Sequence, residues 1–272
     1  MLKGYTKQEI SWMMYDWANS AHSVIIVTLL PIFFDTVAGY TADSVSSMST
    51  WGYATSIAML IVALAAPFLG VFGDIRGMRK KLFSFFMLLG VAACAGMAFT
   101  PGMDFTSGPV AAGKVASLIL VLYIVSVIGF DASAIYYDAF LTDVTIEDRM
   151  DKVSTMGYGL GYIGGSTIPL LIFLIMNLVG VPMLTCLAFV FGLTAVWWLA
   201  FSLPLLKNCE QTSGKPYEKG DVARSIKGVG TTIKEIIANK PMLIYILSYF
   251  FYIDGVHTVI SMATTYGTNL GL

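Results

Sequence analysis

The chain carries very little charge. Only 12% of its 272 residues are Asp, Glu, Lys or Arg, whereas 57% are hydrophobic. Soluble domains contain about 25% charged residues, so this chain has too few to cover a globule in water. A net charge of −1 also excludes the bulk attraction to nucleic acid that a basic chain would have. We therefore expect most of the surface to face lipid.

Cysteine and histidine are also scarce. The three cysteines show no CxxC motif and no paired spacing, and His22 and His257 are the only histidines. These residues predict no disulfide framework, no metal site and no cofactor. An enzyme is not expected, because the chain has no HExxH or GxSxG motif. The N-terminus lacks the ordered regions of a cleaved signal peptide, so we expect the first apolar segment to remain.

Long apolar runs are what the sequence has instead. A helix needs about 20 apolar residues to cross a bilayer, where it satisfies its own backbone hydrogen bonds. Seven segments reach this length, and they predict an all-α polytopic membrane protein. The segments are 10–34, 49–72, 82–100, 115–142, 153–178, 182–205 and 241–264.

The distribution of Lys and Arg predicts the orientation and the division of the chain. Fifteen of the sixteen lie in connections on one side of the predicted membrane, and only Lys114 lies on the other. The positive-inside rule then makes the N-terminus cytoplasmic, with the protein in the cell membrane. We expect a six-span N-terminal lobe (1–205), a basic cytoplasmic linker (206–240) and the first span of an incomplete C-terminal lobe (241–272).

The linker itself has two parts. It begins with NCEQTSGKPYEKGD, which is typical of a flexible connection. Apolar residues recur at helical spacing over 222–238, with lysines between them. This pattern fits either a helix on the inner membrane surface or a solvated linker helix.

An internal similarity supports this division. Residues 19–25 (NSAHSVI) align with 254–260 (DGVHTVI), so the two histidines occupy matching places in the first and seventh spans. A second half that begins at the seventh span is what a six-plus-six duplication predicts, and parallel repeats of this kind are a known transporter design.

Four aspartates interrupt the apolar spans, and no Lys or Arg falls inside those segments to neutralise them. A charge at the bilayer centre costs at least about 2.5–3.5 kcal/mol, so we expect these carboxyls to face a wet cavity or to be protonated. A desolvated carboxyl that exchanges a proton would couple transport to protons. The candidate residues of the substrate or proton pathway are Asp16, Asn19, His22, Asp131, Asp254 and His257. The alternative for each is a polar contact that packs the bundle.

The connection after the second span reads GVFGDIRGMRKK. Its glycines, aspartate and basic residues resemble the major facilitator signature G-x-x-x-D-x-x-G-[RK]-[RK], although Ile75 and Met78 stand where the family often has basic residues. Gly77 permits a tight turn, and Arg79 can hydrogen-bond an acid. The candidate cytoplasmic gate residues are Gly70, Asp74, Arg76, Gly77, Arg79 and Asp138. Asp138 could pair with Arg79 or Arg76, or line the pathway.

Within that superfamily, YDWANSA at 15–21 and YIDG at 252–255 resemble the autophagy-related vacuolar amino-acid effluxers and their bacterial relatives, also called the unknown major facilitator family. The resemblance implies a six-helix lobe, a second lobe beyond this chain, and alternating-access export or exchange of small solutes, which are amino acids for the vacuolar members. It also implies that the first, fourth and seventh spans line the central cavity.

Other readings remain open. The span count alone would suit a seven-helix receptor, or a membrane scaffold that does not transport. A retinal protein would need a lysine in the seventh span and an external N-terminus, and neither is expected here. The glycines at 157, 159, 161, 164 and 165 predict close helix contact and bending. We expect Trp51, Trp197 and Trp198 at the membrane interface.

Overall fold

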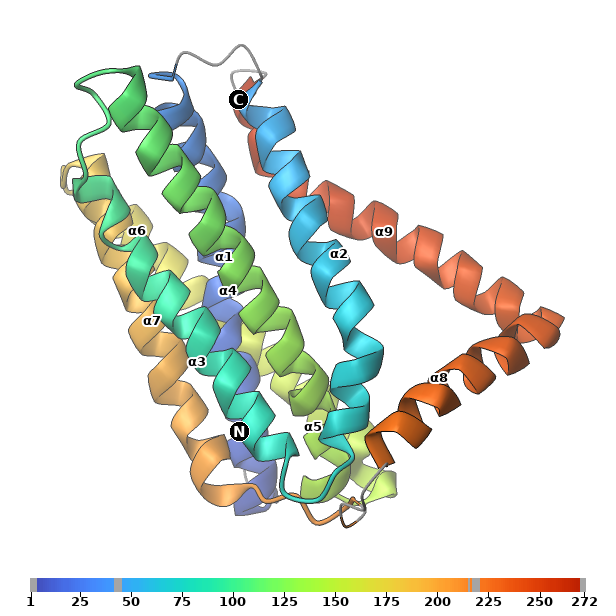
Figure 1. Ribbon diagram of the computed structural model, residues 1–272. Helices are drawn as coiled ribbons and strands as arrows, with labels where there is room; N and C mark the ends of the chain where they lie inside the picture. Colours follow the sequence, from blue (N-terminus) through green and yellow to red (C-terminus); the bar gives the residue numbers. More distant parts are fainter. Residues whose placement is uncertain (1–3, 42–45, 215, 217–220, 270–272) are drawn as a thin grey trace.

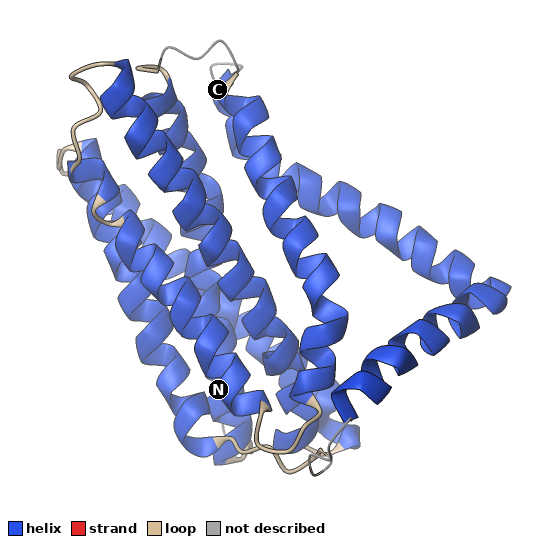
Figure 2. Cartoon of the chain, viewed as in Figure 1, coloured by secondary structure: helices blue, strands red, loops and turns tan. Residues whose placement is uncertain are grey.

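The computed structural model describes residues 4–41, 46–214, 216 and 221–269, and it leaves out the side chains of 221–227, 232, 257, 261, 264, 265, 268 and 269. This part of the chain is helical and has no strand (Figure 2). The α-helices are α1 (Lys7–Ala38), α2 (Ser47–Gly73), α3 (Arg79–Met97), α4 (Pro109–Val144), α5 (Glu147–Leu160), α6 (Thr167–Leu178), α7 (Met183–Asn208), α8 (Asp221–Ala238) and α9 (Lys240–Asn269) (Figure 1).

Seven helical segments in the described part are long and apolar enough to cross a membrane, which confirms the predicted all-α polytopic architecture. The third continues from α3 into a short 3₁₀ helix at Thr100–Gly102. The fifth consists of α5, a π-helical turn at Gly161–Ser166, and α6. Gly180 ends this segment with a φ of +84°, which is the left-handed conformation that glycine adopts without strain. The resulting tight turn makes α6 and α7 a hairpin.

Helices α1 and α4 run antiparallel through the centre of the bundle in a constant register. The Tyr15 hydroxyl lies 2.8 Å from the Ser133 hydroxyl. His22, seven residues further along α1, contacts Ser126, seven residues earlier on α4. A seven-residue repeat on both helices is the packing geometry of a left-handed bundle. This register places α1 among α4, α5 and α7, so much of α1 is buried.

Small residues bring α3 and α4 together. A Cβ atom on Gly129 would lie 2.5 Å from the backbone nitrogen of Gly90, so the two helices touch through their backbones. A Cβ atom on Gly90 would lie 2.4 Å from the Trp198 ring. Close contact of this kind supplies dispersion energy where lipid removes the hydrophobic driving force between helices.

Two of the tryptophans expected at the membrane interface lie in the core. Trp51 is 1% exposed and Trp198 is fully buried. Trp51 packs on Tyr123 with 4.3 Å between the ring centroids. The expectation failed because an aromatic side chain in a membrane helix can also fill space between helices, and sequence position does not distinguish the two uses.

Helices α8 and α9 extend away from the six-span bundle. In Figure 1, α8 leaves the foot of the bundle beside the end of α2, and α9 returns toward the start of α2. A Cβ atom on Gly52 would lie 3.9 Å from the terminal methyl of Met262. Large apolar side chains of α9 such as Tyr245 and Phe251 are exposed. The described residues therefore leave much of α9 without protein contacts.

Candidate functional site

Asp16 lies where α1, α4 and α5 meet. Its carboxylate is half-buried and accepts a 2.9 Å hydrogen bond from the Tyr137 hydroxyl. A Cβ atom on Gly157 would lie 2.7 Å from the same carboxylate oxygen, so glycine is what leaves room for Asp16. Tyr137 directly precedes Asp138 in α4, so the structure brings Asp16 to the part of α4 that carries Asp138, 122 residues later in the sequence.

Asp131 and Asp138 lie on the less buried stripe of α4. Asp131 is half-buried and Asp138 is exposed, whereas Ser126, Ser133 and Tyr137 are buried. Seven residues separate the two aspartates, so they lie on one face of the helix, two turns apart. The carboxylates of Asp131 and Asp138 therefore remain accessible on this face of α4.

Asn19 and His22 lie inside the lobe instead. Their exposed fractions are 8% and 2%. The His22 ring stacks on Phe130 with centroids 4.8 Å apart, and it also contacts Trp198. In this conformation both polar side chains belong to the packed interior, behind the face that carries Asp131.

The hydrogen bonds of Ser126 determine the tautomer of His22. Ser126 donates its hydroxyl proton to the Tyr123 carbonyl at 2.8 Å. The Ser126 oxygen therefore accepts from His22 Nε2 at 3.2 Å, so the imidazole proton is on Nε2. His22 Nδ1 is then a buried acceptor, and it has no partner among the described residues.

Of the two candidates in the seventh span, Asp254 is exposed on α9. The side chain of His257 lies outside the described residues. The structure therefore leaves the expected pairing of DGVHTVI with NSAHSVI as a prediction.

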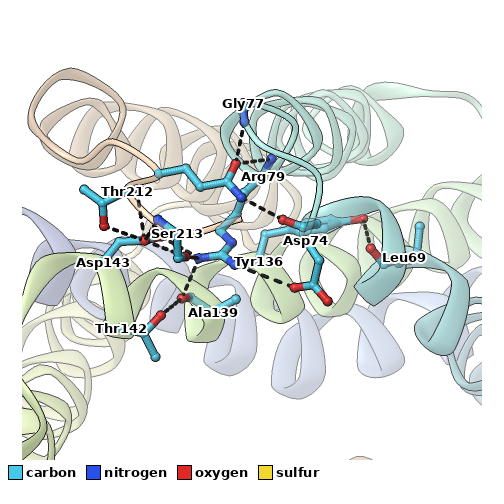
Figure 3. Close-up of polar contacts among 12 residues, drawn as sticks. Leu69, Asp74, Gly77, Arg79, Tyr136, Ala139, Thr142, Asp143, Thr212 and Ser213 are labelled. Atoms are coloured by element: carbon cyan, nitrogen blue, oxygen red, sulfur yellow. Dashed lines mark hydrogen bonds and ion pairs between the residues drawn. The ribbon is translucent and has the colours of Figure 1, made fainter. Parts of the chain in front are cut away.

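The connection between α2 and α3 forms a charge network at the foot of the bundle (Figure 3). Arg79 contacts the Asp143 carboxylate through Nη1, and it lies 3.8 Å from Asp74. The side chains of Arg79 and Asp143 are 6% and 0% exposed, whereas that of Asp74 is 84% exposed. Arg79 also donates to the Ala139 carbonyl at 3.0 Å.

In this network, the acidic residue of α4 that pairs with Arg79 is not the one that the sequence predicted. Asp143 pairs with Arg79, whereas Asp138 is exposed and forms no ion pair with Arg79 among the described residues. One helical turn and a further residue separate the two aspartates, and only Asp143 lies level with Arg79 at the helix end. Sequence reasoning missed Asp143 because it lay just beyond the apolar window ending at residue 142, where an aspartate needs no explanation.

The other candidate gate residues have simpler environments. Gly77 has a φ of +78°, the left-handed conformation of the turn between α2 and α3. A Cβ atom on Gly70 would meet nothing within 4 Å, so the described residues show no close approach there. Arg76 is exposed.

Residues from the start of the linker complete the network. The Gln211 side-chain oxygen accepts from the backbone nitrogens of Gly77, at 2.8 Å, and Arg79, at 3.3 Å. Asp143 Oδ1 accepts from the backbone nitrogens and hydroxyls of Thr212 and Ser213, at 2.7–3.0 Å. These residues fall in the stretch that the sequence predicted to be flexible. The prediction failed for residues 211–213, because short polar residues favour turns and loops whether these are free or docked. Residues 215 and 217–220 of the same stretch lie outside the described residues.

A second ion pair closes the same end of the lobe. Glu9, 1% exposed, accepts from Arg149 through both carboxylate oxygens, at 2.9 and 2.8 Å. Thr6 and Glu9 also form a capping box that starts α1. The motif Thr-x-x-Glu is a sequence signal for a helix start that the sequence analysis did not use, and it does not indicate the partner on α5.

No group of three or more His, Cys, Asp or Glu side chains is placed to hold a metal ion in the part of the chain that was described. The lobe has carboxylates within the apolar helices α1 and α4. Buried polar side chains of the same two helices form a layer next to them.

Comparison with known proteins gives consistent matches. The family described as "Vacuole effluxer Atg22 like" matches residues 37–148 and 142–270. The "Uncharacterized MFS-type transporter YxiO" of Bacillus subtilis is 40% identical over 280 residues, covering all of this chain and 63% of that protein. "Autophagy-related protein 22-1" of Penicillium rubens is 26% identical over 136 residues, or 46% of this chain and 23% of that protein. The chain thus spans less than two thirds of the length of these relatives.

Proposed function

This chain belongs to the family of proteins like the vacuole effluxer Atg22, and we propose that it forms the N-terminal part of a secondary transporter. It would move small solutes across the cell membrane by alternating access, with its N-terminus in the cytoplasm. Amino acids are the first solute class to test, because the resemblance of YDWANSA implies them. A second lobe, of which α9 is the first span, would close the other side of the pathway.

The carboxylates of α1 and α4 are the observation that carries this proposal. Asp16 and Asp131 lie within spanning helices and are half-buried, and no Lys or Arg of the described spans lies in the apolar stretches beside them. A carboxyl in such a place is costly against lipid, and it marks a substrate or proton pathway by default. A membrane scaffold that does not transport has no evident need for it.

The pathway residues then divide into two roles. Asp16 and Asp131 would bind the solute or exchange a proton, and Asp254 and His257 would face them from the second lobe. Asn19 and His22 would form the wall behind the carboxylates.

The cytoplasmic gate is a separate set of residues. It would consist of Asp74, Arg76, Gly77 and Arg79, together with Gly70 and Asp138.

The test is uptake by the complete protein in proteoliposomes with an imposed pH gradient and a mixture of labelled amino acids. Asp131→Asn should abolish the pH-driven component while the protein still inserts and purifies normally. Asp148→Asn is the matched control, because Asp148 is an exposed carboxylate in the first turn of α5. Unchanged uptake by the Asp131 variant at every pH would contradict proton coupling, and absence of uptake by the unaltered protein would contradict the solute class.

A further inference from the structure

Residues 208–214, which we call the strap, cross the foot of the lobe from α7 to α4. The Asn208 amide donates to the Ser11 hydroxyl at 2.8 Å, next to the start of α1. Lys80, in the first turn of α3, donates to the Cys209 carbonyl at 3.1 Å. The strap therefore contacts α1 and α3 before it reaches the charge network.

Gln211 fixes the turn between α2 and α3. Its oxygen accepts from two backbone nitrogens of that turn, and its nitrogen donates to the Gly73 carbonyl at 3.0 Å. One side chain thus satisfies backbone groups on both sides of the left-handed Gly77. Backbone groups at helix ends need such partners, because the helix itself supplies none.

Thr212 and Ser213 cover the buried ion pair. Four donors from these two residues converge on one oxygen of Asp143, and Arg79 donates to the Ser213 hydroxyl at 3.1 Å. A buried ion pair is stable only when further hydrogen bonds satisfy its remaining lone pairs and protons. The strap supplies such bonds to Arg79 Nη1 and to one oxygen of Asp143, whereas Arg79 Nε has no partner among the described residues. The strap belongs to the linker rather than to the helices that carry the pair.

Cys209 shows how closely the strap is packed. Its side chain is fully buried, and its thiol lies 3.6 Å from the Gln8 carbonyl. Burial raises the pKa of this thiol to about 12. A segment that moved freely in solvent would not bury this thiol.

Docking of the strap changes where the linker is attached. The connection to α8 departs from Gly214, beside the charge network, and not from the end of α7 at Asn208. A displacement of α8 and α9 would therefore act on the residues that hold Arg79 and Asp143.

We propose that Gln211, Thr212 and Ser213 are positioning residues through which the linker holds the cytoplasmic charge network and couples it to movement of the second lobe. The coupling part of this inference rests on the proposed transport function, whereas the docking of the strap does not. The experiment therefore needs one readout for each.

The first readout is local. The variant Q211A/T212V/S213A of the complete protein should exchange the amide hydrogens of Gly77 and Arg79 at least about tenfold faster, because each loses its acceptor. Maleimide should also label Cys209 faster, measured in a C94A/C186A background. Glu210→Ala is the matched control, because Glu210 is an exposed strap residue, and its amide exchange should match the unaltered protein. Unchanged exchange in the triple variant would overturn the docking.

The second readout is turnover. Release of the strap should lower the maximal transport rate at least about threefold and leave KM unchanged, since a conformational step rather than solute binding is affected. The conservative variant T212S/S213T keeps both hydroxyls and should restore the rate. Faster exchange with an unchanged maximal rate would overturn the coupling. If the unaltered protein moves no solute, the proposed transport function fails, and amide exchange alone still decides whether the strap docks.

Discussion

Individual polar side chains in this lobe serve two different purposes, and the degree of burial of each side chain indicates which purpose it serves. Asp16 and Asp131 keep part of their surface open, whereas His22 is enclosed by aromatic rings. A polar group that is buried and hydrogen-bonded contributes to packing specificity. A carboxyl left partly open in an apolar helix is costly, and function is the simplest reason to keep it.

The first prediction concerns His22. His22→Phe should fold and transport like the unaltered protein, because the ring still stacks on Phe130 and Ser126 keeps its bond to the Tyr123 carbonyl. The loss of one hydrogen bond should cost about 1 kcal/mol of unfolding free energy. Uptake and thermal unfolding of the purified variant measure both effects. Loss of uptake by a folded variant would place His22 in the pathway itself.

The second prediction concerns the buried Glu9 carboxylate. Arg149→Gln removes both charge-assisted hydrogen bonds and leaves Glu9 with its bonds to Thr6 and Thr145. Removing one partner of a buried ion pair lowers the unfolding free energy by about 3–5 kcal/mol. We expect a loss of about 3 kcal/mol for this variant, because the Arg149 side chain is 34% exposed. Denaturant titration of the solubilised protein measures the loss.

Arg76→Gln provides the comparison for that measurement. Arg76 is an exposed basic residue at the same end of the lobe, so its replacement should change the unfolding free energy by less than about 0.5 kcal/mol. Equal losses in the two variants would mean that general charge at the cytoplasmic end, rather than the pair with Glu9, stabilises the lobe.

At the scale of elements, the fifth span shows why glycine matters to the bundle. The π-helical turn at Gly161–Ser166 lies directly on α1, and a Cβ atom on Gly165 would lie 2.4 Å from the Trp17 carbonyl oxygen. Turns of this kind shift the face that a helix presents, and they occur often at functional sites. A Cβ atom on Gly161, in the same turn, would lie 3.0 Å from the Asp16 carbonyl oxygen, so this contact also fixes α1 beside the Asp16 carboxylate.

The third prediction uses two glycines of this span. Gly165→Ala should destabilise the protein by at least about 1–3 kcal/mol, because the added methyl group meets backbone rather than a side chain that can move. Gly159→Ala should be neutral or stabilising by up to about 1 kcal/mol, since its Cβ would meet nothing within 4 Å. Thermal unfolding of the two purified variants compares them directly. Equal stability of the two variants would show that α1 and the fifth span do not pack this closely.

The sequence predicted these elements well because lipid leaves a chain few options. Length and hydropathy identify spanning helices, since each must satisfy its own backbone. The same reasoning could not predict the π-helical turn or the docked strap, which depend on contacts between distant residues. For the site, spacing placed Asp131 and Asp138 on one face, but only packing could show that Asp143 binds Arg79 and that His22 is enclosed.

At the scale of the whole molecule, orientation decides what each end of the lobe does. The ends of α2, α4 and α7 and the starts of α1, α3 and α5 lie together at the foot of the bundle, with Arg79, Arg149 and the strap (Figure 1). Lys114 lies at the other end, near the start of α4. The asymmetry of basic residues predicts that the foot is cytoplasmic.

The fourth prediction tests that orientation in intact cells. In a background in which Cys94, Cys186 and Cys209 are replaced, a cysteine at Thr106 should react at once with a membrane-impermeant maleimide added outside. Thr106 is an exposed loop residue between α3 and α4. A cysteine at Glu210, exposed on the strap, should react only after the membrane is opened. The reverse labelling pattern would place the charge network outside the cell. Its basic residues would then lie away from the negatively charged inner membrane surface, which attracts Lys and Arg. That result would rule out the proposed cytoplasmic gate.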